Sequence, residues 1–169
     1  HHDGDLPARS GMGSSSSFTV GLLNALHALQ GHMATKEQLA NESIMVEQDL
    51  LKENVGSQDQ VNAAYGGFNH IAFHTSGEIS VRPVIIPPDR QDELTSHLML
   101  FYTGIKRTAD KVAGKYVASL EAKRRQLRIL RDMVEEGLSI LCGHGPIKEF
   151  GELLHEGWLA KQSISDNIS

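Results

Sequence analysis

The sequence predicts an α+β protein made of two small domains, and three observations support this prediction. Near the start, apolar residues recur at three- and four-residue steps, which is the pattern of amphipathic helices. Residues 63–86 alternate between apolar and polar types and are rich in β-formers, as strands are. Long helical patterns then fill most of the second half. We expect a boundary near residue 92, with domains over residues 1–92 and 93–169.

Composition excludes several classes of protein. The chain has 169 residues, a net charge of −5 and one cysteine, Cys142, which favours a reducing cytoplasm. No apolar run approaches the roughly 18 residues of a membrane span. The basic stretch from Lys106 to Arg131 is interleaved with apolar residues at near-helical spacing, which is typical of the solvated face of an amphipathic helix, so we expect no nucleic-acid partner. The histidines lack zinc-site spacing and are expected to be structural or surface residues.

Two helices are expected in the first half. The first spans about residues 14–30, with Gly31 as its stop. The second opens with a capping box, Thr35 and Gln38, and runs to about Lys52. Its expected buried residues are Leu39, Ile44, Val46 and either Leu50 or Leu51.

A hairpin and a strand are expected next. Thr75 to Gly77 form the hairpin turn, and Pro87-Pro88 form a linker. Residues 97–104 read as a buried strand. Two helical stretches follow, over about residues 108–142 and 146–162, and Gly114 and Gly137 are expected to interrupt the first of them.

The run "GMGSSSS", residues 11–17, precedes the first helix and is typical of an anion site. Glycines let the backbone curl closely around a ligand, and the free N–H groups of a helix start attract phosphate. The run is not a Walker loop, because no Gly-Lys-Ser/Thr is present. It also lacks the third glycine of a dinucleotide fingerprint and the glycine spacing of a nucleophile elbow.

Three acidic residues could complete such a site. Asp59 lies between two glutamines in an expected loop, where a carboxylate can act as a general base or a metal ligand. Glu47 stands twelve positions earlier, with Glu42 about one turn before it. Hydroxyl and carboxylate oxygens completed by phosphate and water are the usual ligands of Mg²⁺.

These motifs resemble a known family. "PARSGMGSSSS", from Pro7 to Ser17, is similar to the second signature of the galacto-homoserine-mevalonate-phosphomevalonate (GHMP) kinases, with Met12 where leucine is usual. The spacing from Glu47 to Asp59 resembles that family's metal and catalytic acids. "GSQDQVNAAYGGFNHIAF", "LMLFYTGIKRTA" and "LLHEGWLAKQSIS" look most like the sugar kinases that act on D-glycero-D-manno-heptose 7-phosphate.

The resemblance implies a role for each matched residue. Asp59 would be the catalytic base that accepts a proton from the sugar, and Ser15 with Glu47 would bind Mg²⁺. Gln58, Tyr65 and Gly66 would contact the substrate. The residues that would bind ATP are Pro7, Arg9, Ser10, Gly11, Met12, Gly13, Ser14 and Ser15.

The resemblance also implies a fold and a function. The fold would be the two-domain GHMP fold, present only in part, with a ribosomal-protein-S5-like N-terminal domain and a ferredoxin-like, helix-rich C-terminal domain. The family's terminal glycine-rich signatures do not occur here, so we expect an internal portion of a longer enzyme.

That enzyme would transfer the γ-phosphoryl of ATP to the anomeric hydroxyl of a heptose 7-phosphate. Alternatives are a galactose- or fucose-type kinase, or a non-catalytic ligand-binding protein on the same scaffold. The expected ligands are ATP, Mg²⁺ and a sugar or sugar phosphate, in the cytoplasm and without a membrane partner. The oligomeric state stays open, a homodimer included.

Overall fold

The computed structural model describes residues 11–102 and 124–164 of the chain. Among these, residues 11–81 belong to one compact unit, and residues 82–102 with 124–164 belong to a second. Helices dominate both units, and a single two-stranded sheet is present among the described residues. The structure is therefore a partial α+β fold that is mostly helical. No helix in these ranges is both long and apolar enough to cross a lipid bilayer.

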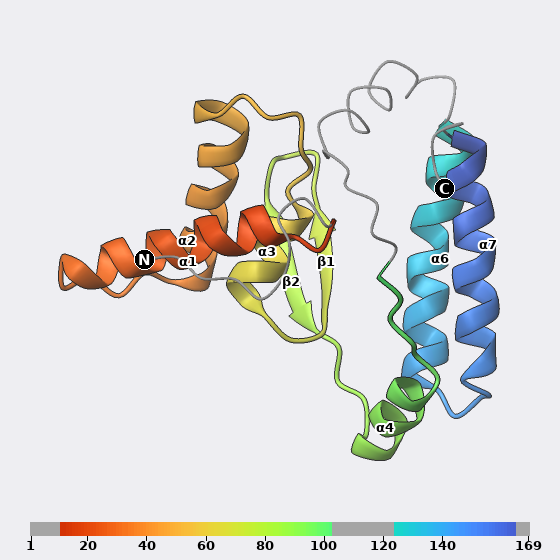
Figure 1. Ribbon diagram of the computed structural model, residues 1–169. Helices are drawn as coiled ribbons and strands as arrows, with labels where there is room; N and C mark the ends of the chain where they lie inside the picture. Colours follow the sequence, from red (N-terminus) through yellow and green to blue (C-terminus); the bar gives the residue numbers. More distant parts are fainter. Residues whose placement is uncertain (1–10, 103–123, 165–169) are drawn as a thin grey trace. The chain divides into compact units, whose positions relative to one another are not determined.

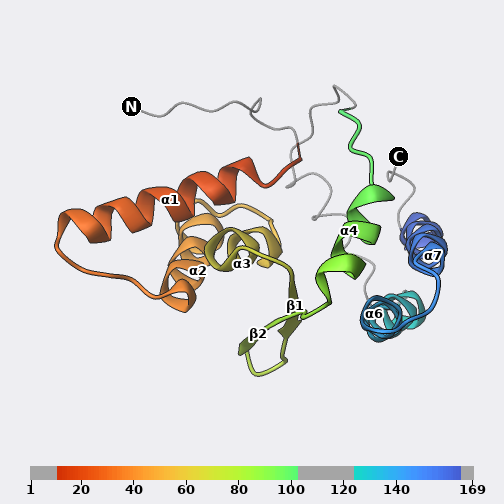
Figure 2. The same cartoon turned by 90° about the horizontal axis from the view of Figure 1, so that it is seen from below.

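Three helices build the first unit: α1 (Ser14–Leu29), α2 (Lys36–Ile44) and α3 (Gln58–Tyr65), which pack on one another (Figures 1 and 2). The expected first helix is confirmed and ends one residue early. The apolar core of the unit is small and is complemented by buried polar residues. Its buried apolar residues are Val20, Leu39, Ala40 and Val61, and its buried polar residues are Ser16, Ser43, Glu47 and Gln60.

The second expected helix changes its winding. Thr35 caps α2 as predicted, since its Oγ1 accepts a hydrogen bond from the backbone N–H of Gln38 at 3.1 Å. At Met45 the helix becomes a π-helix, η1 (Met45–Leu50), which an i→i+5 bond from Leu51 N to Val46 O continues. The wider turn rotates the last side chains away from the α-helical pattern. The expected burial of Leu50 or Leu51 is therefore wrong, because both are exposed.

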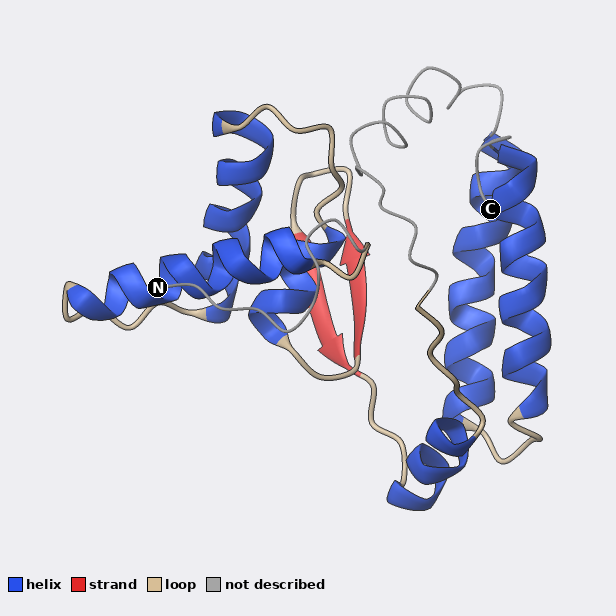
Figure 3. Cartoon of the chain, in the orientation of Figure 1, coloured by secondary structure: helices blue, strands red, loops and turns tan. Residues whose placement is uncertain are grey.

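The predicted hairpin is confirmed, with shorter strands than the sequence pattern indicated. Strands β1 (Asn69–Phe73) and β2 (Ile79–Pro83) pair across a turn closed by hydrogen bonds from Gly77 N to His74 O and from His74 N to Glu78 O (Figure 3). Gly77 has φ +90°, a conformation that suits glycine in a tight turn.

The second unit contains α4 (Pro88–Ser96), α6 (Arg124–Cys142) and α7 (Lys148–Ile164). The expected linker at Pro87-Pro88 is wrong: Pro88 is the first residue of α4, where its missing N–H costs no hydrogen bond. Helices α6 and α7 lie side by side and antiparallel (Figures 1 and 3).

The two glycines that were expected to interrupt the long helix have different outcomes. Gly137 does not interrupt α6. It lies where α6 contacts α7, since a Cβ added at this position would lie 3.4 Å from the ring of Phe150. Gly114, with the rest of residues 108–123, lies outside the described residues.

Arg90 ties α4 to the end of α6. Its guanidinium is nearly buried and donates to the backbone oxygens of Ile140 at 2.8 Å and Leu141 at 3.5 Å. It also pairs with Glu93 at 2.6 Å. Because the C-terminal carbonyls of a helix carry partial negative charge, this cation caps α6 from another helix.

The buried strand expected over residues 97–104 is wrong in its described part. Residues 98–102 form neither strand nor helix, and their exposed fractions run from 57% at Leu98 to 84% at Leu100. A strand needs a hydrogen-bonding neighbour, and no described segment pairs with this one. Residues 103 and 104 lie outside the described ranges.

Candidate active site

The start of α1 exposes backbone donors. Gly11 and Gly13 have φ values of +77° and +68°, which L side chains rarely adopt, and Gly13 is the N-cap of α1 without a side-chain cap. The first intrahelical bond runs from Ser17 N to Gly13 O, so the amides of Ser14, Ser15 and Ser16 have no intrahelical acceptor. The first turn carries no acidic residue. This helix start can therefore bind an anion.

Asp59 lies against the same turn. A Cβ added to Gly13 would stand 3.7 Å from both Cγ and Oδ2 of Asp59. The expected loop position of this aspartate is wrong, because Asp59 belongs to the first turn of α3. A carboxylate is favoured there by the helix dipole, and the side chain is exposed.

Glu47 lies in the middle of η1 and is 2% exposed. Two donors converge on its Oε2: the hydroxyl of Ser16 at 3.1 Å and the amide Nε2 of Gln60 at 2.5 Å. Its other oxygen, Oε1, is buried and has no hydrogen-bond partner among the described residues. One side of this carboxylate is therefore fixed by the protein, while the other is left for a further ligand.

The loop between η1 and α3 is held by Gln48. Its amide nitrogen donates to the backbone oxygen of Val55 at 3.0 Å and to Oγ of Ser57 at 3.1 Å. Since Ser57 is the N-cap residue of α3, these bonds fix the start of the helix that carries Asp59. Glu42 takes no part in this arrangement, because its carboxylate binds His27 and Gln38.

The other predicted site residues are dispersed. Ser15 and Met12 are exposed at the start of α1, and Gln58 is exposed at the first position of α3. Tyr65 and Gly66 lie at the opposite end of α3, about 10 Å along its axis from Asp59. Pro7, Arg9 and Ser10 lie outside the described residues.

Sequence reasoning missed Ser16 and Gln60. The hydroxyl that contacts Glu47 belongs to Ser16, whereas Ser15 is exposed. A signal was available for Ser16, because it stands four positions before Val20, which marks the buried face of α1. Gln60 directly follows Asp59, but only the folded structure shows that it points back to Glu47.

The donor set is compatible with Mg²⁺ without being complete. A carboxylate oxygen lacking a protein partner, beside a serine hydroxyl, is the oxygen chemistry that a hard cation prefers. The described residues contain no group of three or more His, Cys, Asp or Glu able to hold a metal. Magnesium commonly keeps several waters and substrate phosphates as ligands, so a sparse protein set fits it.

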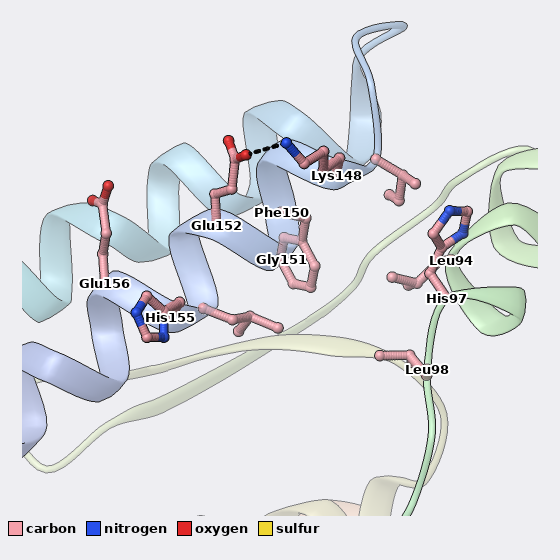
Figure 4. Close-up of a pocket in the computed structure, with 11 residues that line it drawn as sticks. Leu94, His97, Leu98, Lys148, Phe150, Gly151, Glu152, His155 and Glu156 are labelled. Carbon is pink, nitrogen blue, oxygen red and sulfur yellow. Dashed lines mark ion pairs between the residues drawn. The ribbon is translucent and has the colours of Figure 1, made fainter.

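The second unit contains a hollow of about 610 Å³ (Figure 4). It is formed by the end of α4 and the first half of α7, with Leu94, Leu98, Phe150 and Leu154 among its apolar walls. A Lys148–Glu152 ion pair of 2.8 Å lies on α7 beside it. None of the predicted catalytic, ATP or metal residues lines this hollow.

The described start of α1 and the two acids, Glu47 and Asp59, all lie in the part of the chain that matches a known family. Residues 1–67 match the model of the GHMP kinases N terminal domain. This part of the chain is therefore similar to the N-terminal domain of that family.

The individual relatives are sugar kinases. The chain is 25% identical to the D-glycero-alpha-D-manno-heptose 7-phosphate kinase of Campylobacter jejuni, over 100% of this chain and 50% of that protein. It is 28% identical to the L-fucokinase/L-fucose-1-P guanylyltransferase of Bacteroides fragilis, over 97% of this chain and 18% of that protein. A galactokinase of Pyrococcus furiosus is 27% identical over 75% of this chain and 34% of that protein.

A solved structure supports the fold. The crystal structure of a D-glycero-D-manno-heptose 1-phosphate kinase from Bacteroides thetaiotaomicron matches with a TM-score of 0.69 and 27% identity. The match covers 94% of this chain and 46% of that one. The chain therefore spans about half the length of its heptose kinase relatives.

Proposed function

We propose that this chain is part of an ATP-dependent sugar kinase that phosphorylates the anomeric hydroxyl of a heptose 7-phosphate. The observation that carries the proposal is the position of Asp59 beside the start of α1, where a Cβ added to Gly13 would lie 3.7 Å from its carboxyl group. A carboxylate able to accept a proton thus lies beside backbone donors able to hold a phosphate. In this proposal, residues 1–92 are the latter part of the ATP-binding domain, and residues 93–169 begin the C-terminal domain.

ATP binding is assigned to the turn that precedes α1. The amides of Ser14 to Ser16 donate to phosphate oxygens, and the partial positive charge of the helix start favours the anion. Gly11 and Gly13 keep the turn free of side chains at positions where φ is positive. Pro7, Arg9 and Ser10 would extend this contact.

Asp59 is assigned the role of general base. It accepts the proton of the anomeric hydroxyl while that oxygen bonds to the γ-phosphorus and the bond from phosphorus to the bridging oxygen of ADP breaks. Positioning and charge neutralisation supply most of the rate in phosphoryl transfer, so one exposed carboxylate with fixed donors around it is enough.

Ser15 and Glu47 are assigned to Mg²⁺. When bound, Mg²⁺ would neutralise charge on the phosphates. The hydroxyl of Ser15 is exposed at the helix start, and Oε1 of Glu47 keeps its lone pairs unused by the described protein groups. Both are the hard oxygen ligands that this cation takes.

The heptose assignment rests on the relatives, and Gln58, Tyr65 and Gly66 are the residues that would contact the sugar. A fucose- or galactose-type kinase is the second candidate, because the fucokinase and galactokinase relatives are as similar in identity as the heptose kinase.

The test measures ADP release by the full-length protein with ATP, Mg²⁺ and a panel of D-glycero-D-manno-heptose 7-phosphate, galactose and fucose. We expect turnover with the heptose phosphate. Asp59→Asn should lower kcat at least about 100-fold and keep nucleotide binding, because a neutral amide cannot accept the proton. Asp49→Asn, at another exposed aspartate, is the matched control. Turnover with no sugar, or an active Asp59→Asn enzyme, would refute the assignment.

A further inference from the structure

We propose that Ser16 and Gln60 are positioning residues that fix Oε2 of Glu47, so that Oε1 is the oxygen presented to the cation. This inference rests on the proposed function, since it names the residues that hold Glu47, the metal ligand of that proposal, in place. It adds two residues that neither the signature of residues 7–17 nor the spacing of the acids predicts.

The first argument is the cost of burying Glu47. A carboxylate that is 2% exposed is strongly destabilised unless donors compensate its lost hydration. Ser16 and Gln60 are themselves only 4% and 1% exposed, and both direct their donors at the same oxygen. Bonds from neutral donors to an ionised group are stronger than bonds between neutral groups, so these two restrict the rotation of the carboxylate.

The second argument is the asymmetry of the carboxylate. Oε2 has two protein donors, whereas Oε1 has none among the described residues although it is equally enclosed. Buried oxygens normally have partners, and an exception in a native site calls for a ligand, an ion or a water. A metal ligand whose one oxygen is held by supporting side chains, while its other oxygen has no protein partner, has this arrangement.

The third argument is the place of Gln60 in α3. It directly follows Asp59, and consecutive residues of a helix point about 100° apart, so one side chain is exposed while the other is buried. The helix that presents the proposed base to the phosphate turn thereby also holds the proposed metal ligand. A shift of α3 would move both.

The experiment measures Mn²⁺ binding to the full-length protein by electron paramagnetic resonance, in the presence of a non-hydrolysable ATP analogue and without sugar. Ser16→Ala removes a single oxygen, and Gln60→Glu keeps the shape of the side chain but replaces its donor by a second acceptor. We expect each to raise the Kd for Mn²⁺ about 10- to 100-fold. Ser17→Ala, at the exposed neighbouring serine, should leave the Kd unchanged.

Steady-state kinetics and thermal unfolding separate positioning from a purely structural role. We expect the apparent KM for Mg²⁺ to rise in Ser16→Ala while kcat at saturating Mg²⁺ is largely kept. The double variant Glu47→Gln with Gln60→Glu exchanges the two side chains, so that an amide donor at position 47 again faces a carboxylate acceptor at position 60. It should recover the unfolding temperature lost in Gln60→Glu without recovering Mn²⁺ affinity, because the carboxylate then stands on α3.

Two results would contradict the positioning role of Ser16 and Gln60. Single variants that unfold at lower temperature but keep the wild-type Kd for Mn²⁺ would overturn the inference and make the cluster purely structural. Absence of Mn²⁺ binding by the wild-type protein would overturn it as well. The kinase proposal is judged separately, by ADP release with the sugar panel, so the two can fail independently.

Discussion

Two carboxylates in neighbouring elements have opposite surroundings. Asp59 is exposed at the start of α3, whereas Glu47 is enclosed in η1 and bonded on one oxygen only. An exposed carboxylate can reach the hydroxyl of a bound substrate, and a fixed buried one can hold a cation without rearranging. At the scale of residues, this contrast is what assigns the proposed base and the proposed metal ligand.

The turn glycines give a prediction for single residues. Gly11→Ala and Gly13→Ala should each destabilise the protein by about 1 kcal/mol, because both φ values are positive. Only the methyl group at Gly13 would contact the Asp59 carboxyl, at 3.7 Å, whereas the space around Gly11 is open. We therefore expect Gly13→Ala to lower kcat further, by about tenfold or more. Urea unfolding and steady-state kinetics measure the two effects, and equal kcat values in both variants would contradict the contact.

Residue patterns allowed part of the site to be predicted. Glycine and serine before an amphipathic helix indicate an anion site without reference to the rest of the fold, and the structure has the positive φ values that such a turn needs. The spacing to Val20 indicates that Ser16 is buried, but the bonds of Ser16 and Gln60 could not be predicted, since both depend on Glu47, which is 31 and 13 positions away in the sequence.

At the scale of elements, α1 and α2 are linked by a pH-sensitive contact. Glu42 accepts hydrogen bonds from His27 at 2.7 Å and from Gln38 at 2.8 Å. The bond with His27, followed by that with Gln38, lowers the pKa of Glu42 below its ordinary value. A carboxyl whose pKa is lowered on folding stabilises the fold above its unfolded-state pKa. That contribution is lost as the pH falls through the folded-state value.

The variant Glu42→Gln tests this contact. Near pH 6 it should lower the free energy of unfolding by about 0.5–1 kcal/mol, a modest effect because the pair is partly exposed. The difference from the wild type should shrink as the pH falls below about 4 and through the lowered pKa of Glu42, because the carboxyl is then increasingly protonated in the folded state as well. Urea unfolding across this range measures it, with Glu53→Gln as an exposed control. A difference that does not change with pH would contradict the assignment.

The pairing of α6 with α7 gives a matched prediction for two glycines. A larger side chain at Gly137 would collide with Phe150 and Leu153, at 3.4 and 3.5 Å from its Cβ, so Gly137→Leu should destabilise the protein by about 1–3 kcal/mol. Gly151 on α7 faces open space. There the same substitution should stabilise by about 0.5–1 kcal/mol, because glycine is a poor helix former. Thermal unfolding distinguishes them, and destabilisation of the same size in both would argue against the contact.

Local patterns predicted α1, the Thr35 cap and the hairpin because each depends on neighbours in the sequence. They failed where a distant partner decides the structure. Pro88 begins helix α4, whose Arg90 is held by backbone oxygens at the end of α6. In α2 and η1, polar residues (Ser43 and Glu47) are buried where apolar residues were expected. The sequence around Asp59 carries no strong apolar period, so it predicts a loop where the structure has the start of α3.

At the scale of the whole molecule, the exposed run of residues 98–102 predicts poor colloidal behaviour. Met99 and Leu100 are 81% and 84% exposed, and contiguous apolar surface promotes association. Replacing both by serine should reduce light scattering and dye binding by the chain, with an unfolding free energy within about 0.5 kcal/mol of the wild type. Ile147→Ser, at a buried position of the same unit, should instead cost about 2–5 kcal/mol. Destabilisation by the serine pair would mean that this run is packed.

The bond between Arg90 and α6 also sets an order of events during synthesis. Arg90 is made 50 residues before Ile140, whose carbonyl it binds. At about 5–20 residues per second, the ribosome needs roughly 3–10 s to add that intervening stretch. Helix α4 has nine residues, too few for a stable isolated helix in water. It can therefore be held in place only after the end of α6 has emerged, so the first-made part of the second unit is among the last to become ordered.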